Sequence, residues 1–176
     1  MRILIIHEID WEKKVVFEPH HLAELFSIQG HEIFVIDCAQ PNSKDLVKGM
    51  HTRILSNYSR VYENANITLI RPASFLVKGL NRITHFFSCK KIIEKTIQEK
   101  GIERIFLYGS ITNGIQTIKA AQKKNIPVIY RLLDISHSLI NIPIVKHIAK
   151  MCHRNTLRIT HVNRVVVTYV CVLTAH

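Results

Sequence analysis

Cysteine is scarce in this sequence, and the cysteines present are scattered. The 176 residues include four, Cys38, Cys89, Cys152 and Cys171, and no two of them form a C-x-x-C pair. Secreted domains stabilised by disulfides carry a denser set, so we expect a reducing, cytoplasmic compartment. A chain of this length buries enough apolar surface to fold without disulfides.

Long apolar runs are missing as well. A membrane-spanning helix needs about 20 apolar residues, and the run at 165–173 is about half that long. The opening run at 3–6 is followed at once by His7, Glu8 and Asp10, so it lacks the apolar core and cleavage site of a signal peptide. We therefore predict a cytoplasmic protein, either soluble or peripheral at a membrane.

Carboxylates are missing from the last quarter of the chain. Lys and Arg number 24 against 13 Asp and Glu, a formal charge of +11, and the last acidic residue is Asp134. A basic domain is attracted to anionic surfaces. Over 142–158 apolar residues lie opposite Lys146, Lys150 and Arg154, a pattern typical of interfacial helices. A non-catalytic basic module that binds an anionic membrane surface is therefore one functional alternative.

Motifs for metal and nucleic acid are absent. Although there are 11 histidines, none has the paired spacing of a zinc ligand set. His20 and His21 are neighbours, and on a helix their side chains point about 100° apart. Aromatic residues make up only 7% and form no stacking platform. We expect no metal and no cofactor, and we rank nucleic acid below a membrane as the anionic partner.

What the chain does have is an alternation of strand and helix patterns. Continuous β-branched runs predict buried strands at 2–6, 32–37, 104–108, 126–130 and 164–173, and shorter strands are expected at 52–55 and 67–70. Helical spacing, Pro19 and Gly30 predict helices at 19–29, 80–100, 114–124 and 144–157. This alternation predicts an α/β fold, with a doubly wound, mostly parallel Rossmann-like sheet and helices on both faces, in one domain spanning 1–176.

Open parallel sheets bind ligands at the carboxyl ends of their strands, near the point where the strand order reverses. The first candidate loop there follows the first strand and carries His7, Glu8, Asp10 and Glu12. It has no glycine, so the dinucleotide fingerprint is absent. Its carboxylates can accept hydrogen bonds from sugar hydroxyls or act as a general base. The alternative is a solvated surface loop.

The second candidate loop begins with Gly109 and Ser110 and leads into a helix near Gly114. It lacks the Lys-Ser/Thr pair of a phosphate-binding P-loop. Backbone N–H groups at the helix start favour an anion. The alternative is that Thr112 or Asn113 only caps the helix.

The third candidate loop holds Arg131, Asp134, Ser136 and His137. Asp134 follows a strand directly, which suits proton transfer or the holding of a substrate hydroxyl. The alternative is an ion pair between Arg131 and Asp134 that closes the loop. A complete small α/β enzyme that uses Asp134 and His137 is a third functional possibility, although no G-x-S-x-G motif is present.

Three segments, in order along nearly the whole chain, resemble the N-terminal half of GT-B glycosyltransferases of the family 4 type. The first is RILIIH at 2–7, with Gly30-His31-Glu32 leading into IFVI at 33–36, where that family has a Gly-His-Glu/Asp-Val turn. The second, NIPVIYRLLDI at 125–135, is similar to the family's IPVVYTLHDI. The third, NRVVVT at 163–168, is similar to the strand AD-x-V-x-x-x-S that closes the domain.

The resemblance implies an acceptor-binding domain that works with a donor-binding domain in retaining sugar transfer from a nucleotide-sugar, which is a substrate and not a cofactor. The implied acceptor is a lipid-linked molecule or a polysaccharide. The family's His-Asp after the fifth strand falls on Leu133-Asp134, so only the aspartate matches, and we assign Asp134 as the catalytic candidate. The acceptor-binding candidates are His7, Glu8, Asp10, Gly109, Ser110, Asn113, Arg131 and His137.

The chain departs from this family in two further respects. The family often has a glycine pair after its first strand, where this chain has His7 to Trp11. The chain also ends where the N-terminal domain would end, and the segment at 152–163 lacks the acidic helix expected there. We therefore expect the donor-binding domain to be absent, through truncation or a damaged reading frame. The chain should then be inactive unless a separate polypeptide supplies that domain.

Overall fold

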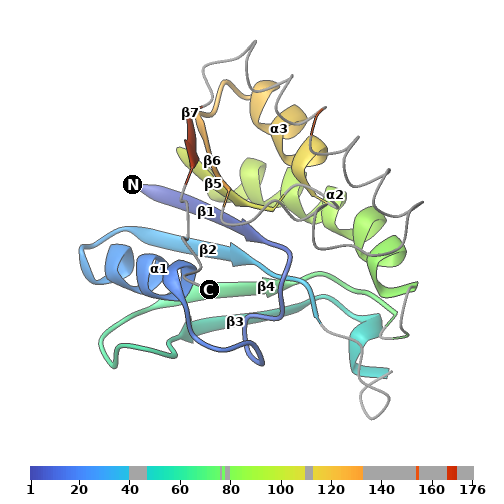
Figure 1. Cartoon of the computed structure of the whole chain (residues 1–176), viewed down its shortest axis with the longest axis horizontal. Coiled ribbons are helices and arrows are strands. Elements are labelled where there is room, and N and C mark those ends of the chain that lie inside the picture. Colours follow the sequence, from blue (N-terminus) through green and yellow to red (C-terminus); the bar gives the residue numbers. More distant parts are fainter. Residues whose placement is uncertain are drawn as a thin grey trace, which may run out of the picture.

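The opening isoleucine run forms the central strand of one mixed sheet. The structure is a computed structural model, and it describes residues 1–39, 47–75, 77, 80–109, 113–132, 154 and 166–169. Over these residues the strand order is β3-β4-β2-β1-β5-β6-β7 (Figure 1). Without β3, this is the order of a Rossmann-like sheet, and it reverses between β1 and β5.

Six of the strands described run parallel, and the edge strand β3 is antiparallel to β4. The bounds are β1 (Arg2–His7), β2 (Glu32–Ile36), β3 (Arg53–Tyr58), β4 (Ile67–Arg71), β5 (Arg104–Tyr108), β6 (Val128–Leu132) and β7 (Val166–Tyr169). The predicted fold class is confirmed.

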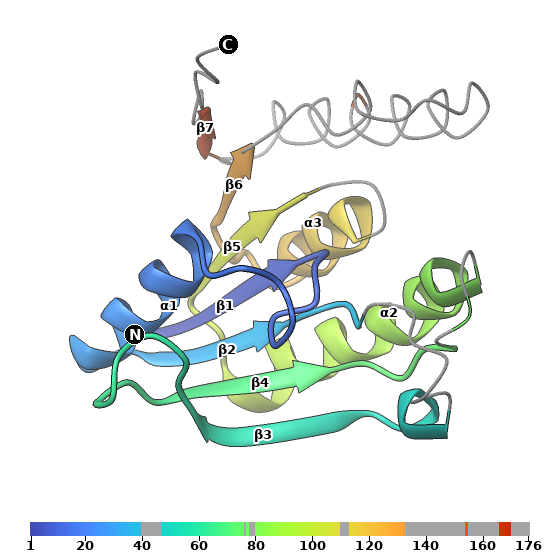
Figure 2. The same ribbon diagram turned by 60° about the horizontal axis from the view of Figure 1, so that its bottom comes forward.

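Helices cover both faces of the sheet (Figure 2). They are α1 (Glu18–Ile28), α2 (Leu80–Lys100) and α3 (Gly114–Gln122), with a short 3₁₀ helix, η2 (Val47–Met50), before β3. Side chains of a strand alternate between faces. Ile3 and Ile5 therefore pack on the α1 side with Ala23, whereas Leu4 and Ile6 pack on the side of α2 and α3.

The ends of the helices follow from local chemistry. Pro19 lies in the first turn of α1, where its missing N–H costs nothing. Gly30 follows the end of α1 with φ +83°, and Gly101 follows α2 with φ +56°, both in the left-handed region that favours glycine. These stops agree with the bounds expected from the sequence.

One buried carboxylate fastens α1 to the segment before β4. Glu24 is fully buried and accepts hydrogen bonds from the backbone N–H groups of Arg60, Val61 and Tyr62, at 2.7, 2.8 and 2.8 Å. Three N–H donors to the oxygens of one side chain form a strong arrangement. This contact fixes the segment that leads from β3 to β4.

One predicted strand is shifted in the structure, and one predicted helix lies almost entirely outside the described residues. The sixth strand was expected at 126–130 and lies at Val128–Leu132. The reason is Pro127, which has no N–H to donate and contributes only its carbonyl, to Ile105 N, at the start of the ladder. The helix predicted at 144–157 falls outside the described residues apart from Arg154, which is helical.

Candidate functional site

Three residues form the last rung of the sheet at the point where the strand order reverses. Tyr108 ends β5, and it is in register with His7 of β1 on one side and Arg131 of β6 on the other. Neighbours in register on parallel strands point to the same face. The sequence thus brings together side chains from three separate strands.

His7 occupies an aromatic box on this rung. Its ring stacks on Tyr108, with centroids 5.2 Å apart and planes inclined by 11°, and it meets Phe17 and Trp11 edge-on at 5.6 and 6.4 Å. The residue is only 7% exposed. Among the described residues, neither ring nitrogen has a hydrogen-bond partner. A buried polar group left in this state costs about 1–3 kcal/mol, so the arrangement calls for an explanation.

Burial decides the charge of His7. Desolvation, helped by the nearby His20, lowers the pKa of His7 from 6.5 to about 3. The ring is therefore neutral near pH 7, with one nitrogen that donates and one that accepts. This combination suits a hydroxyl group, which also donates and accepts, better than it suits a phosphate.

A glutamate at the start of α1 covers the other end of the rung. Glu18 Oε1 accepts a hydrogen bond from the Tyr108 hydroxyl at 3.2 Å and pairs with Arg131 Nη2 at 3.1 Å. The Arg131 guanidinium also lies 5.9 Å from the centre of the Tyr108 ring. Burial, followed by the charge of Glu18, raises the pKa of Tyr108, so its hydroxyl stays a donor.

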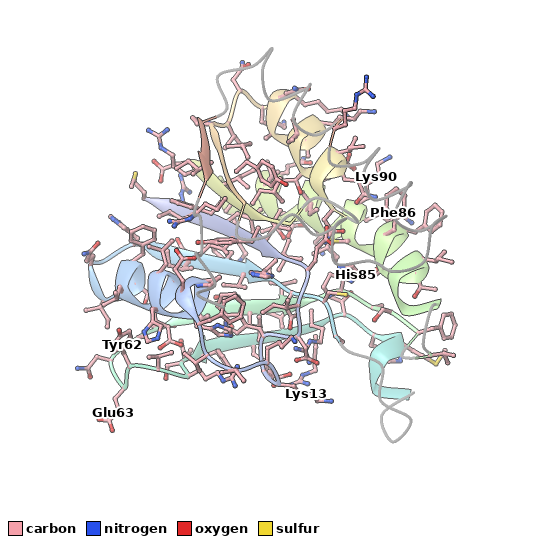
Figure 3. The ribbon with its side chains drawn as sticks, in the orientation of Figure 1. Lys13, Tyr62, Glu63, His85, Phe86 and Lys90 are labelled. Carbon is pink, nitrogen blue, oxygen red and sulfur yellow. The ribbon has the colours of Figure 1, made fainter. Side chains whose placement is uncertain are left out.

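The opposite face of the same edge carries a second group of polar side chains. The N–H of Asn113, the N-cap residue of α3, donates to Glu8 Oε1 at 2.9 Å. The Asn113 side-chain nitrogen lies 3.2 Å from Nε2 of His85, a buried residue on the sheet-facing side of α2 (Figure 3). The start of α3 is thus already in contact with a carboxylate.

Gly109 adopts a left-handed backbone conformation between these two groups of side chains. It follows Tyr108 directly and has φ +85°, a conformation that other residues adopt with strain. A Cβ placed there would meet the Glu8 side chain at 3.5 Å, which is ordinary contact. The glycine is therefore needed for its backbone conformation more than for space.

A partly buried arginine holds the loop that follows β1. Arg71, the last residue of β4, pairs with Asp10 at 2.8 Å, with Glu12 at 2.6 Å and with Asp37, to which it also donates from Nε at 3.0 Å. Asp10 Oδ1 further accepts the N–H groups of Glu12 and Lys13. The loop is thereby tied to the ends of β2 and β4.

Burial and ion pairing have opposite effects on the pKa values in this cluster. Burial raises the pKa of Asp37, and the hydrogen bonds and charge of Arg71 offset part of that rise. Burial alone would lower the pKa of Arg71, but the bonds and charges of Asp37, Asp10 and Glu12 outweigh it and raise the pKa. Arg71 therefore stays charged and is the counter-ion on which the fold of this loop depends.

Within the described part of the chain, no group of three or more His, Cys, Asp or Glu side chains is placed to hold a metal ion. A search of the same residues for a helix both long and apolar enough to cross a membrane finds none.

Comparison with known proteins gives fold similarity only. No protein-family model and no curated protein sequence matches the chain. The chain resembles a putative UDP-N-acetylglucosamine 2-epimerase from Listeria monocytogenes, with a TM-score of 0.47, 13% identity, and 89% of this chain matching 42% of that one. The UDP-GlcNAc 2-epimerase from Methanocaldococcus jannaschii gives a TM-score of 0.39 at 13% identity, covering 95% of this chain and 45% of that chain.

A different enzyme class appears among the similar structures. A short-chain dehydrogenase/reductase from Burkholderia vietnamiensis has a TM-score of 0.44 at 8% identity, covering 100% of this chain and 87% of that chain. The chain thus spans less than half the length of the two epimerases and most of the dehydrogenase. Because these enzymes perform different chemistry, their likeness assigns no activity to this chain.

The described residues gather most of the predicted acceptor-binding candidates at one edge of the sheet. His7, Gly109 and Arg131 lie on or beside the last rung, and Glu8 and Asn113 meet on its other face. Asp10 points instead into the Arg71 cluster. Three predicted residues, Ser110, Asp134 and His137, lie outside the described residues, as does the expected Arg131–Asp134 ion pair.

The structure also corrects one alternative and adds residues that sequence reasoning missed. A solvated surface loop after β1 was one alternative, and it is wrong, because Asp10 and Trp11 are fully buried. For the second loop, Asn113 is the N-cap by position, but its side chain makes no capping hydrogen bond. The missed residues are Glu18, Asp37, Arg71, His85 and Tyr108. Of these, Asp37 and Tyr108 stand at the carboxyl ends of predicted strands, a position that could have drawn attention to them.

Proposed function

We propose that this chain is the acceptor-binding part of a GT-B-type glycosyltransferase, which transfers a sugar from a nucleotide-sugar to a lipid-linked or polysaccharide acceptor. The acceptor binds at the carboxyl ends of β1, β5 and β6. The nucleotide-sugar is held by a donor-binding domain outside these residues, or on a separate chain. The segments similar to family 4 enzymes, which include β1, β2, β6 and β7, support this proposal.

The observation that carries the proposal is the imidazole of His7, which has no hydrogen-bond partner in the described part of the chain. It is nearly fully buried, it lies where the strand order reverses, and burial keeps it neutral. A neutral imidazole with a donor and an acceptor both unused matches an acceptor hydroxyl. Its low pKa makes it a weak base, so we give His7 a binding role and not a proton-transfer role.

Proton transfer is assigned to Asp134 in this proposal. The acceptor hydroxyl oxygen forms a bond to the anomeric carbon of the donor sugar, and the bond from that carbon to the nucleoside diphosphate breaks. The hydroxyl proton passes to a base, for which Asp134 is the candidate because it follows β6 by two residues. Arg131, the last residue but one of β6, adds a positive charge at this edge of the sheet, where it pairs with Glu18.

Saturation-transfer NMR on the whole chain tests the acceptor site. The probes are methyl glycosides of glucose, galactose, mannose and N-acetylglucosamine, together with UDP and GDP. We expect saturation transfer to at least one glycoside and none to the nucleotides. His7→Phe should abolish the glycoside signal, and His21→Phe, at an exposed position on α1, should leave it unchanged. No glycoside signal, or tight binding of UDP or GDP, would contradict the proposal.

The alternative of a non-catalytic basic module stays a prediction. Its evidence in the sequence is the charge of +11 and the amphipathic pattern at 142–158. Apart from Arg154, that segment falls outside the residues that the structure describes. The glycoside experiment therefore distinguishes the two functions.

A further inference from the structure

Large apolar side chains are exposed at the start of α2. We call these the α2 patch: Met50, Phe75, Val77, Ile83, Phe86 and Phe87, which are between 41% and 67% exposed. Scattered exposed apolar residues are ordinary, but a contiguous group marks a contact surface. Phe87 is 67% exposed, and its ring meets that of Phe86 at 90° with centroids 5.4 Å apart.

Hydrogen bonds connect the segments that carry the patch. Phe75 N donates to Thr84 Oγ1 at 2.9 Å, and Ser88 Oγ donates to the carbonyl of Ala73, so the segment after β4 lies against the first turns of α2. Ser74 N donates to the carbonyl of Gly49 at 2.7 Å, which brings η2 beside the same segment. Figure 1 shows η2 next to the start of α2. The patch is therefore one surface built from three segments.

The charge around the patch has one sign. Between Glu63 and Glu94 the sequence carries no carboxylate. Apart from Arg71, which pairs with carboxylates of other segments, its basic residues are Lys78, Arg82, Lys90 and Lys91. Lys90 and Lys91 are exposed on α2. Phe86 and Lys90 are one helical turn apart, and Figure 3 places both on the outer side of α2. Apolar side chains beside lysines are typical of elements that lie on anionic membranes.

We propose that the α2 patch docks on an anionic lipid bilayer. The aromatic side chains enter the boundary between headgroups and acyl chains, and the lysines contact the anionic headgroups, each adding about 1 kcal/mol near such a surface. A second copy of the chain fits less well, because a symmetric contact would bring two patches that carry the same positive charge together. This inference does not depend on sugar transfer and uses a different surface from 142–158.

The patch lies close to the candidate site. The first turns of α2 stand at the same side of the sheet as the carboxyl ends of β1 and β4 (Figure 1). His85, next to Phe86, contacts Asn113, which in turn contacts Glu8, and Gln116 of α3 donates to the carbonyl of Phe86 at 2.9 Å. A docked bilayer would therefore lie beside the acceptor-binding edge.

Vesicle sedimentation tests the docking surface. The whole chain is mixed with vesicles of phosphatidylcholine alone, or of phosphatidylcholine with about a third phosphatidylglycerol, at low and high salt. We expect binding to the anionic vesicles that is several-fold stronger than to the neutral ones and weaker at high salt. Phe86→Ser with Phe87→Ser should reduce it at least tenfold, and Leu25→Ser with Ile28→Ser, two exposed apolar residues of α1, should not.

A charge reversal distinguishes vesicle binding through the α2 patch from binding through the net charge of the chain. Lys90→Glu with Lys91→Glu should lose most of the binding, whereas Lys119→Glu with Lys124→Glu, also exposed, should keep most of it. Equal losses in the two variants, or equal binding to neutral and anionic vesicles, would overturn the proposal. A dimer in sedimentation velocity that the Phe86 and Phe87 substitutions dissociate, with no vesicle binding, would assign the patch to a second copy instead.

Discussion

The imidazole of His7 stacks on the ring of Tyr108 with the ring centroids 5.2 Å apart, at the last register position between β1 and β5. The two residues are 101 positions apart in the sequence. Their contact places a neutral, unpartnered donor and acceptor at the reversal of the strand order. The consequences of that arrangement are measurable without knowledge of any ligand.

His7→Phe should fold as well as the parent chain or better at neutral pH. Phenylalanine keeps the aromatic packing and removes two buried nitrogens that lack partners among the described residues. We expect the free energy of unfolding to stay equal or to rise by about 1 kcal/mol. Urea unfolding measures it, with His21→Phe as the control, and a loss above about 2 kcal/mol would contradict the orphaned state of His7.

The same substitution should change how stability depends on pH. The pKa of His7 is about 3 in the folded chain and 6.5 ordinarily, so between these pH values the unfolded chain binds a proton that the folded chain does not. This group therefore lowers stability as the pH falls from about 6.5 towards about 3, by up to about 1.4 kcal/mol per pH unit. The advantage of His7→Phe over the parent should grow between about pH 7 and about pH 5. A constant difference would mean that His7 titrates normally.

Arg71→Met should be among the most damaging single substitutions. It leaves Asp10 and Asp37, both fully buried, without their counter-ion. We expect a loss of about 3–5 kcal/mol in the free energy of unfolding. Arg53→Met is the control, because Arg53 is about half exposed and its described ion pair is a single contact with Glu12 at 3.1 Å. It should cost less than about 1 kcal/mol. Adding Asp37→Asn to Arg71→Met should restore part of the loss, and no recovery would contradict the assignment.

Gly109→Ala should separate backbone strain from contact with Glu8. Gly109 and Gly30 have similar φ values, +85° and +83°, but only Gly109 has a side chain within reach of a new Cβ. Both alanine substitutions should cost about 1–2 kcal/mol in thermal unfolding. Only Gly109→Ala should alter glycoside binding, because only there does the new methyl group touch a candidate site residue. Altered binding in Gly30→Ala would point to a global effect.

Glu24→Gln should loosen the segment that joins β3 to β4. An amide keeps one acceptor oxygen but places an NH₂ group against backbone donors, where Glu24 accepts three N–H groups. We expect a loss of about 1.5–3 kcal/mol and faster hydrogen exchange at residues 60–62. Glu63→Gln, at an exposed position in the same stretch, should change neither, and unchanged exchange in Glu24→Gln would contradict the role given to Glu24.

The fold was largely predictable because its signals are local. Each of three such signals can be recognised from a few residues: the apolar run at 3–6, Pro19 in the first turn of α1, and Gly30 after its end. The burial of β1 also followed from its continuous apolar run. Even the small error at β6 has a local cause in Pro127.

The side-chain arrangement at the site was less predictable because its contacts join distant parts of the chain. Arg71 and Asp10 are 61 residues apart, and Asn113 and Glu8 are 105 apart. In the sequence Arg71 is only the polar end of a strand, and nothing near it indicates three carboxylate partners. A solvated loop after β1 was therefore one alternative from the sequence, although long-range pairing buries Asp10 there.

The contact of Glu8 with the start of α3 has a consequence for selectivity. The exposed N–H groups at a helix start normally attract phosphates, and here a carboxylate of the protein itself accepts one of them. An incoming phosphate would have to displace this internal anion and bear its repulsion, whereas an uncharged sugar would not. Under the function proposed above, the Glu8 carboxylate would favour an uncharged sugar over a nucleotide at this edge of the sheet.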